Sequence, residues 1–242
     1  MFLTGPQSRH FRPEKFEGLS RRGNHFDWEL FYRFKDDRER FWLKQVETNP
    51  SFKRLVETHF ARFQESINTT IRYLEATQEP LVLDVGLSSE PLDRALMMRL
   101  DAKVLVLDVQ EEAGATYESV FGSKGSFVLG DVITYSADRA NTERFDLVFS
   151  FGLIEHFPDK RDILDAHIEL AKPGGIVLLY VPIDSPDNRE LTAMAAEWEN
   201  FGYRELLTVD ELAEVCADPR LDVLAAEPVG FFSAVWARRK TT

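Results

Sequence analysis

The chain has 242 residues, and its 41 aspartates and glutamates outnumber its 29 lysines and arginines, giving a formal net charge of −12. This acidity excludes a generally basic nucleic-acid coat protein. Apolar residues make up 44% of the chain and charged residues 29%, so the sequence can bury a core and is not disordered throughout. The length allows one large α/β unit.

Cysteine content and hydropathy indicate a cytoplasmic protein. The single cysteine, Cys216, cannot form a disulfide within the chain, which suits a reducing compartment. Basic residues interrupt roughly the first 30 positions, so we expect no secretory leader there. No stretch reaches the about 18 uninterrupted apolar residues that a membrane-spanning helix needs, and we expect no membrane partner.

The two parts of the chain differ in charge. Residues 1–79 carry 14 basic and 12 acidic side chains, whereas residues 80–242 carry 15 basic and 29 acidic ones. This difference predicts a boundary near Pro80, with an N-terminal arm and helical cap at 1–79 and an α/β domain at 80–242.

The N-terminal part predicts an irregular arm and two helices. Residues 1–23 combine glycines and prolines with scattered charges, which is typical of irregular structure. Apolar residues then recur at spacings of three, four and seven over 27–47, which predicts a helix. A second helix is expected over 50–76, because Asn49 and Pro50 break the chain and a long apolar stripe follows them.

After Pro80, short apolar runs alternate with helix-compatible stretches. This alternation predicts α/β crossovers and a doubly wound, mostly parallel sheet with helices on both faces. Near the end, Thr208 opens a capped helix, and Gly230 divides two strands of an antiparallel hairpin. Strands are expected at 81–86, 103–109, 127–132, 145–151, 176–183, 221–229 and 231–239, and the helices between them at 91–100, 111–121, 136–140 and 159–171.

Ligands of a doubly wound sheet bind at the carboxyl ends of its strands, near the point where the strand order reverses. Gly86 follows the first predicted strand, and a glycine there lets the backbone turn closely toward a ligand. Asp108 ends the second strand, where a carboxylate can accept hydrogen bonds from both hydroxyls of a ribose. The third strand ends in Asp131 and Val132, which suit the amine and the face of a purine.

The fourth predicted strand and its continuation carry a more specific pattern. Residues 145–159 read FDLVFSFGLIEHFPD, and AKPGG at 171–175 precedes the run IVLLYVP. This segment resembles the fourth strand, the following turn and the fifth strand of class I S-adenosylmethionine-dependent methyltransferases. The resemblance covers residues 80–239 and implies a seven-stranded sheet whose last strand is reversed, which agrees with the predicted hairpin.

The resemblance implies S-adenosylmethionine as the cofactor and assigns roles to the strand ends. It places Asp84 and Gly86 at the methionine moiety, with Ser88 in the same loop, and Asp108 at the ribose. The other cofactor contacts that it implies are Asp131 and Val132 at the adenine and Ser150 and Phe151 beside the sulfonium.

The first of these loops departs from the family pattern. Members of the family usually have an acidic residue followed by three alternating glycines, whereas Ser88 and Glu90 stand in the second and third glycine positions here. S-adenosylmethionine carries no pyrophosphate, so the glycines serve close approach rather than phosphate binding, and a small Ser88 can replace one. Glu90 precedes Pro91, which suits the first turn of a helix, and we expect its carboxylate to point away from the cofactor.

Glu155 and His156 are the predicted catalytic residues. An unperturbed imidazole titrates near neutral pH, so His156 suits a general base beside the methyl group, with Glu155 next to it. The alternative is that both residues only brace the following helix. Related metal-dependent methyltransferases have another carboxylate three residues before the glutamate, but that position is Gly152 here, and we expect no metal.

Two groups of residues are candidates for binding the acceptor. Phe26, Trp28 and Tyr32 lie at the start of the first predicted helix, off its main stripe, and can line a pocket or belong to an ordinary core. Tyr203 and Arg204 lie in the segment between the fifth strand and the closing helix, where they can bind a polar or anionic acceptor or belong to an ordinary surface.

The favoured function is therefore S-adenosylmethionine-dependent methyl transfer to an oxygen or nitrogen of a small molecule. Ser88 and Glu90 favour one alternative, a silent methyltransferase fold that serves as a partner subunit. The basic residues from Arg9 to Arg22 favour another, an RNA or tRNA methyltransferase, but the strongly acidic C-terminal part argues against a nucleic-acid partner. The oligomeric state stays open, with a homodimer as one option.

Overall fold

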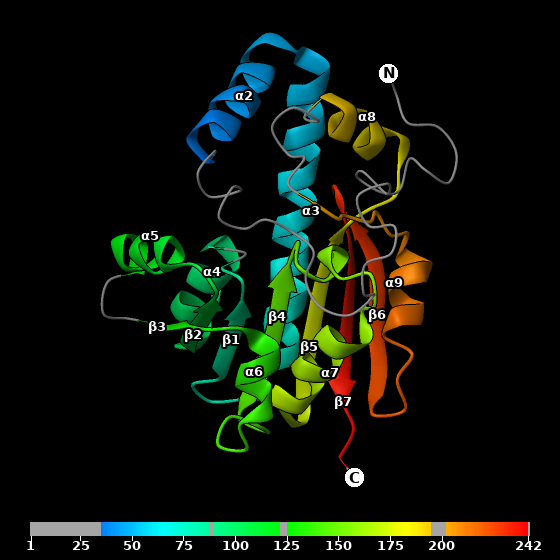
Figure 1. Ribbon diagram of the computed structural model, residues 1–242. Coiled ribbons are helices and arrows are strands. Elements are labelled where there is room, and N and C mark those ends of the chain that lie inside the picture. The colour runs from blue at the N-terminus through cyan, green and yellow to red at the C-terminus, as the bar shows by residue number, and fades with distance from the viewer. Residues whose placement is uncertain (1–34, 88–89, 122–124, 195–201, 242) are drawn as a thin grey trace.

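The computed structural model describes residues 35–87, 90–121, 125–194 and 202–241 (Figure 1). They form a seven-stranded sheet with the strand order β3-β2-β1-β4-β5-β7-β6. The first five strands are parallel, and β7 runs antiparallel to both of its neighbours. The mostly parallel sheet and its C-terminal antiparallel hairpin confirm the predicted fold class. The strands are β1 (Leu81–Val85), β2 (Lys103–Asp108), β3 (Ser126–Leu129), β4 (Phe145–Phe151), β5 (Ala171–Pro182), β6 (Leu221–Val229) and β7 (Phe232–Arg239).

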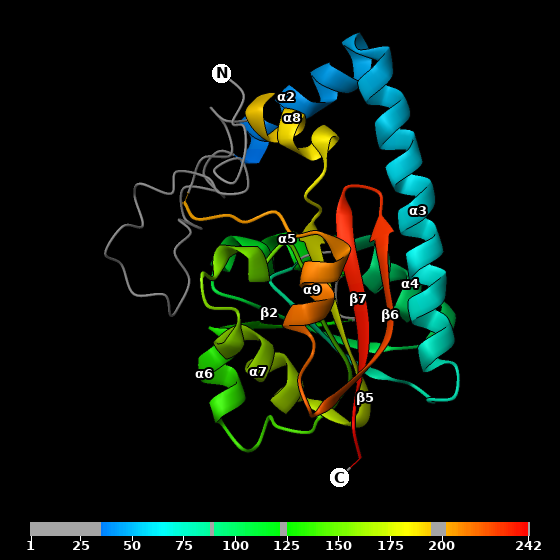
Figure 2. The same cartoon turned by 90° about the vertical axis from the view of Figure 1, so that its right-hand side faces the viewer.

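Helices cover both faces of the sheet (Figure 2). One core cluster joins the sheet to α3, α4 and α5, and the other joins it to α6, α7 and α9. None of the described helices is long and apolar enough to cross a membrane. The helices are α2 (Lys35–Thr48), α3 (Pro50–Leu74), α4 (Glu90–Leu100), α5 (Glu111–Phe121), α6 (Val132–Ala137), α7 (Arg161–Leu170), α8 (Pro186–Met194) and α9 (Val209–Val215), with a short 3-10 helix, η4 (Ile154–His156).

The long helix α3 connects the N-terminal region to the sheet. The side chain of Asn49 accepts hydrogen bonds from the backbone N–H groups of Ser51 and Phe52, and Pro50 occupies the first turn, so the helix begins as predicted. Its second half is buried against the sheet. Its first half extends past the carboxyl ends of the strands, where α2 and α8 also lie (Figures 1 and 2). The expected start of the first helix, at residues 27–34, lies outside the described residues.

The segment after β3 differs from the prediction. We expected the strand to run to Val132, but it ends at Leu129 and a helix begins at Val132. The carboxylate of Asp131 accepts a hydrogen bond from the backbone N–H of Thr134 at 3.0 Å, which caps this helix. The apolar run therefore spans a strand, a turn and the first turn of a helix. The predicted helix at 136–140 was too late by one turn, because α6 ends at Ala137.

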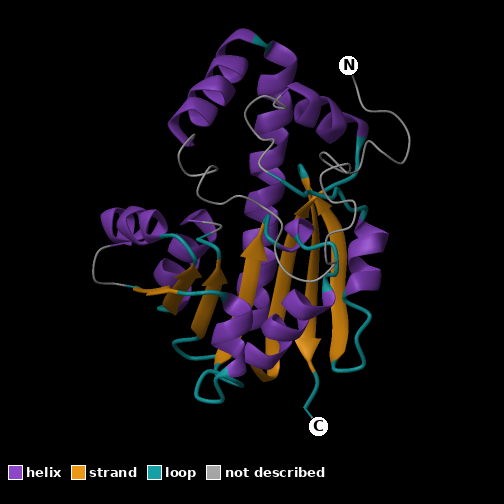
Figure 3. Ribbon diagram, viewed as in Figure 1, coloured by secondary structure: helices purple, strands orange, loops and turns teal. Residues whose placement is uncertain are grey.

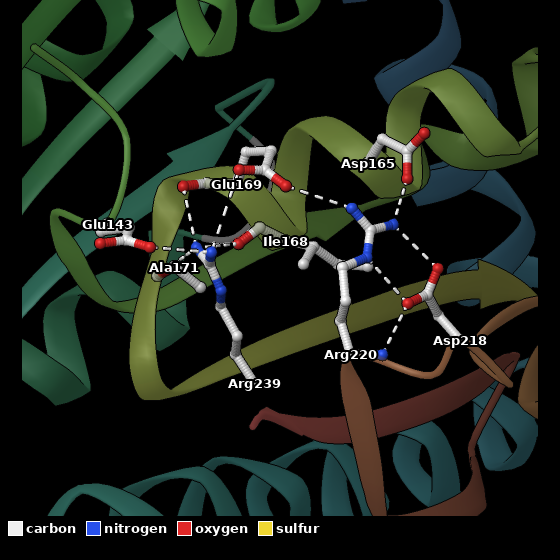
Figure 4. A network of polar contacts seen from close by, with 8 residues as sticks. All are labelled: Glu143, Asp165, Ile168, Glu169, Ala171, Asp218, Arg220 and Arg239. Carbon is white, nitrogen blue, oxygen red and sulfur yellow. Dashed lines mark hydrogen bonds and ion pairs between the residues drawn. The ribbon is translucent and has the colours of Figure 1, made fainter. Parts of the chain in front are cut away.

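Two arginines join the amino-terminal ends of the parallel strands to the hairpin (Figure 4). Arg220 donates to the carboxylates of Asp218, Asp165 and Glu169, which raises the pKa of the guanidinium and lowers that of Asp218. Arg239 donates to three backbone carbonyls around the turn from α7 to β5 and to the carboxylate of Glu143 at 3.0 Å. This network fixes the ends of β5, β6 and β7.

Candidate active site

The carboxyl ends of β1, β2 and β4 lie at one edge of the sheet (Figure 3). β1 pairs with β2 on one side and with β4 on the other, so the order of the strands reverses between β1 and β4. The helices that follow these two strands, α4 and α7, cover opposite faces of the sheet, and ligands of such sheets bind at this switch point. The predicted site residues that follow these strands therefore share one edge of the sheet.

Gly86 opens the loop after β1. Its backbone has a φ of +94°, in the region that favours glycine, and its N–H donates to the carbonyl of Leu107 at 2.8 Å. A Cβ atom added at Gly86 would meet nothing within 4 Å, so space lies directly above this backbone. The turn thus provides a backbone surface that a ligand can approach closely.

Two buried carboxyl groups, those of Asp84 and Asp93, lie on the strand before this loop and on the helix after it. Both side chains are 0% exposed, Asp84 on β1 and Asp93 on α4. Burial and the neighbouring Asp84 carboxyl raise the pKa of Asp93 well above its usual value. Neither oxygen of Asp93 meets a hydrogen-bond donor among the described residues. Asp93 was not predicted as a site residue, because an acidic residue in the first turn of a helix is usually exposed.

Asp108 and Asp131 follow the next two strands. Asp108 ends β2, is 5% exposed, and accepts a hydrogen bond from the backbone N–H of Gln110 at 2.8 Å. Asp131 is exposed, and its Oδ1 is held by Thr134 as the cap of α6. Val132 is buried in the core cluster beneath it.

Ser150 and Phe151 end β4 and are held by different neighbours. The Nδ1–H of His167 donates to the carbonyl of Ile163 at 2.7 Å, so Nε2 accepts from the hydroxyl of Ser150 at 3.1 Å. Burial lowers the pKa of His167 to about 4, which keeps the ring neutral. The Phe151 ring packs 4.2 Å from that of Phe232, between ring centroids. His167 is a second residue that was not predicted from the sequence, because a histidine on the buried face of a helix resembles ordinary core.

The structure brings Glu155 and His156 together with Tyr203 and Arg204. The Nδ1–H of His156 donates to the carbonyl of Tyr203 at 2.8 Å, and His156 Nε2 lies 3.8 Å from Glu155 Oε1. The backbone N–H of Glu205 donates to the carbonyl of Glu155 at 3.1 Å. The two predicted catalytic residues and two of the predicted acceptor-binding residues therefore form one cluster at the end of β4.

Burial dominates the electrostatics of this cluster. It raises the pKa of Glu155 to about 7, against an opposing effect of Arg204 and Lys160. It also lowers the pKa of His156 to about 3, so the imidazole is neutral at physiological pH. The Glu155 Oε2 atom meets no hydrogen-bond donor in the described part of the chain. At neutral pH, Glu155 is the member of the pair that titrates.

Four predicted site residues lie outside the described residues. These are Ser88 in the loop after β1 and the aromatic group Phe26, Trp28 and Tyr32. Glu90 is described, and it begins α4 with its carboxylate paired to Arg94 at 2.7 Å on the surface. The ion pair holds the Glu90 carboxylate on the surface of α4, and its direction relative to the cofactor stays a prediction.

A cavity of about 760 Å³ lies elsewhere, between the start of α7 and the end of α9, with Arg161 and Leu164 among its lining residues. None of the predicted site residues lines it. Within the described ranges, no three histidine, cysteine, aspartate or glutamate side chains are grouped as metal ligands.

Comparison with known proteins identifies the family. The sequence pattern of the family described as methyltransferase domain matches residues 73–224, more than half of the chain. The chain belongs to the class I S-adenosylmethionine-dependent methyltransferases. Its cofactor is S-adenosylmethionine.

The methyltransferase is similar to curated enzymes named ubiquinone biosynthesis O-methyltransferase. It is 26% identical to the one from Leptothrix cholodnii over 180 residues, which cover 69% of this chain and 76% of that one. It is 27% identical to one from Cereibacter sphaeroides over 159 residues, or 63% and 62% of the two chains. The match therefore spans just under two thirds of the Cereibacter enzyme.

Solved structures share the fold. A Burkholderia thailandensis 1,6-didemethyltoxoflavin-N1-methyltransferase, with its acceptor and S-adenosylhomocysteine bound, superimposes with a TM-score of 0.56 at 19% identity, covering 85% of this chain and 87% of that one. An O-methyltransferase family protein from the same organism gives a TM-score of 0.58 at 17% identity, covering 86% and 62%.

The described strand ends of the methyltransferase fit its cofactor. The open backbone surface at Gly86 admits a close ligand, and the buried carboxyl groups beside it suit a positively charged amine. The carboxylate of Asp108 suits the hydroxyls of a ribose, which donate hydrogen bonds to it. These features stand in the chain order that the family resemblance implies.

Proposed function

We propose that the enzyme methylates a hydroxyl group of a small molecule. When bound, S-adenosylmethionine supplies an electrophilic methyl group on a sulfonium, which the acceptor attacks in line. The observation that carries this proposal is the cluster of Glu155, His156, Tyr203 and Arg204 at the end of β4, next to the predicted sulfonium position. A hydroxyl needs a group to take its proton during transfer, and this cluster holds one that titrates near neutral pH.

The proposed cofactor contacts follow the strand ends. Asp84 and Gly86 receive the methionine moiety, Asp108 the ribose, and Ser88 completes the first loop. Asp131 receives the adenine amine, and its carboxylate is already oriented by Thr134 as the cap of α6. The proposed set is completed by Val132 at the adenine and by Ser150 and Phe151 beside the sulfonium.

Glu155 and His156 act as one proton-accepting unit in this proposal. Because the carbonyl of Tyr203 holds the proton of His156 on Nδ1, the Nε2 atom carries a lone pair, 3.8 Å from Glu155 Oε1. A neutral imidazole with a pKa of about 3 is a weak base by itself. An ionised Glu155 beside it stabilises the imidazolium that forms when His156 takes the proton. The pair therefore requires Glu155 to be ionised.

The small-molecule acceptor is supported by the electrostatics of the edge and by the relatives. Asp84, Asp108 and Asp131 make the carboxyl edge acidic, which disfavours a phosphate backbone. The similarity to ubiquinone biosynthesis O-methyltransferases favours oxygen over nitrogen as the methylated atom. Tyr203 and Arg204, with Phe26, Trp28 and Tyr32, remain the proposed acceptor-binding residues, and the boundary near Pro80 remains a prediction.

Methylation of a panel of small hydroxyl and amine acceptors tests this proposal. The full chain is incubated with methyl-labelled S-adenosylmethionine and each acceptor, and the products are separated by mass spectrometry. We expect a methyl ether, and we expect His156→Ala to lower its rate of formation more than it lowers cofactor affinity. Exclusive methylation of RNA, or of amines, would contradict the proposed acceptor.

A further inference from the structure

The buried pair of Asp84 and Asp93 has an electrostatic property that the proposed reaction does not use. The Asp84 carboxyl lies close enough to Asp93 to raise its pKa beyond the effect of burial, and neither Asp93 oxygen meets a donor among the described residues, since a carboxylate can only accept. Both are shielded from water, being 0% exposed. Two neighbouring carboxylates cannot both remain charged in such a place, so one of them keeps a proton.

The groups that face this pair add to the effect. Glu90, from the first turn of α4, raises the pKa of Asp93 further, after burial and Asp84. Burial, with the two aspartates, raises the pKa of Tyr117 on α5, so its hydroxyl stays neutral near the pair. Arg94 is paired with Glu90 at the surface. Among the described residues, no basic side chain contributes to the pKa shift of Asp93.

Gly86, which follows β1, belongs to the proposed binding place of the cofactor's methionine moiety. Asp84 lies two positions before Gly86 in the chain, and the space above Gly86 is open. The amino group of that moiety carries a positive charge at neutral pH, and a cation beside a carboxyl pair favours its ionised form. Cofactor binding and loss of the shared proton are thus coupled through Asp84.

We propose that Asp84 and Asp93 hold one proton between them in the cofactor-free protein and release it to solvent when the cofactor's ammonium group binds beside Gly86. Asp93 is then a positioning residue, which sets the charge of Asp84. This inference rests on the proposed cofactor contacts of Asp84 and Gly86.

Calorimetric titration of S-adenosylhomocysteine into the full chain measures the proton. At pH 7, titrations in buffers with different ionisation enthalpies give the number of protons released, which we expect to be close to one. Affinity should rise with pH, by up to tenfold for each unit, while the cofactor-free pair stays protonated. Tight binding without proton release would overturn this inference alone. No binding by the folded protein would contradict the proposed function.

Two further ligands identify the group responsible. Methylthioadenosine lacks the amino-acid part and should bind without proton release. Decarboxylated S-adenosylhomocysteine keeps the amine and should still release the proton. Release with methylthioadenosine would assign the proton to another part of the site and overturn the inference.

Asp93→Asn should abolish proton release, while the control Asp146→Asn should keep it. Asp146 is a partly buried carboxylate that binds Lys172 at 2.9 Å near the other end of the sheet. Equal proton release from Asp93→Asn and wild type would overturn the proposal. If Asp93→Asn does not fold, infrared difference spectra of the wild type decide, because binding should remove the absorption of one protonated carboxyl group and an unchanged band would refute the inference.

Unfolding without cofactor provides an independent readout. A carboxyl group whose pKa is raised in the folded state stabilises the protein below its unfolded pKa, and this contribution is lost as the pH rises through the folded pKa. Asp93→Asn should therefore gain stability relative to wild type as the pH rises from about 4. A stability difference that stays constant with pH would contradict the shared proton.

Discussion

Charged side chains at the two ends of the sheet differ in their hydrogen-bond partners. At the amino-terminal ends of the parallel strands, two arginines each bind several oxygens (Figure 4). Arg220 binds carboxylates, and Arg239 binds mainly backbone carbonyls. At the carboxyl ends, Asp93 and Glu155 are buried with oxygens that meet no hydrogen-bond donor among the described residues.

This difference separates stability from function. A buried polar atom without a partner costs free energy, so a fold keeps such atoms mainly where a ligand or a reaction uses them. The two arginines stabilise the hairpin. The buried carboxyl groups, in contrast, have oxygens without a donor at the end of the sheet where the cofactor is proposed to bind, so a ligand can supply the missing interaction. Substitutions at the two ends should therefore have separable effects.

The largest effect is expected from Glu155→Gln. Because the amide cannot ionise, kcat should fall by about 10²–10⁴-fold, the usual range for losing a proton-transfer group. In the wild type, kcat should rise with pH to a plateau with an apparent pKa of about 7, since only ionised Glu155 supports proton uptake by His156. Steady-state rates between pH 5 and 9 measure both.

Glu169→Gln is the matched control for this pH profile, since Glu169 binds Arg220 at the other end of the sheet. Its rate and its pH profile should equal those of the wild type. A wild-type profile that is flat from pH 5 to 9 would remove Glu155 from the reaction.

Asp108→Ala should weaken the binding of S-adenosylhomocysteine by about 1–3 kcal/mol, the scale of a hydrogen bond to a charged group. Calorimetry measures the affinity, and circular dichroism verifies the fold. Asp222→Ala, which changes a largely exposed side chain on β6, serves as the control. Equal affinity in both variants would show that Asp108 lies outside the site.

Arg220→Met should show the opposite pattern, with lower stability and unchanged cofactor affinity. The substitution leaves Asp165, Glu169 and Asp218 close together without their shared cation. We expect a loss of about 1–2 kcal/mol in urea unfolding at pH 7, since the guanidinium is partly exposed. Arg238→Met, at an exposed position on β7, should change stability by less than about 0.5 kcal/mol. Weaker cofactor binding in Arg220→Met would break the separation between the two ends.

The smallest effect is expected from Glu90→Gly. It removes the pair with Arg94 and a negative charge at the start of α4, which together are worth about 1 kcal/mol or less of stability. Cofactor affinity should stay within twofold of the wild type. A tenfold gain in affinity would mean that Glu90 repels the cofactor instead.

The regular parts of the fold could be predicted because local patterns determine them. β4 matches its expected bounds, since Phe145–Phe151 is a mostly apolar run, broken only by Asp146 and Ser150, and most of it is buried. The capped start of α9 was also predicted, and Thr208 and Glu211 form a reciprocal capping box. The predicted end of β3 was wrong. The sequence stays apolar beyond Leu129, but Asp131 caps a helix there, which hydropathy alone does not reveal.

The candidate site was predictable one strand end at a time, but its contacts were not. Glu155 and Tyr203 were named separately, and only the path of the chain between β5 and α9 brings the Tyr203 carbonyl to His156, 47 positions away in the sequence. Asp93 and His167 were missed for a related reason. Their residue types and spacing are ordinary for helices, and their importance comes from burial against β1 and β4.

A nuclear magnetic resonance titration of the labelled protein with S-adenosylhomocysteine tests the central claim most directly. The account predicts that the backbone amide signals of Gly86, Asp108 and Phe151 shift on binding, while those of Arg220 and Arg239 do not. Shifts confined to the Arg220 network or to the cavity between α7 and α9, with unchanged signals at the ends of β1, β2 and β4, would contradict it.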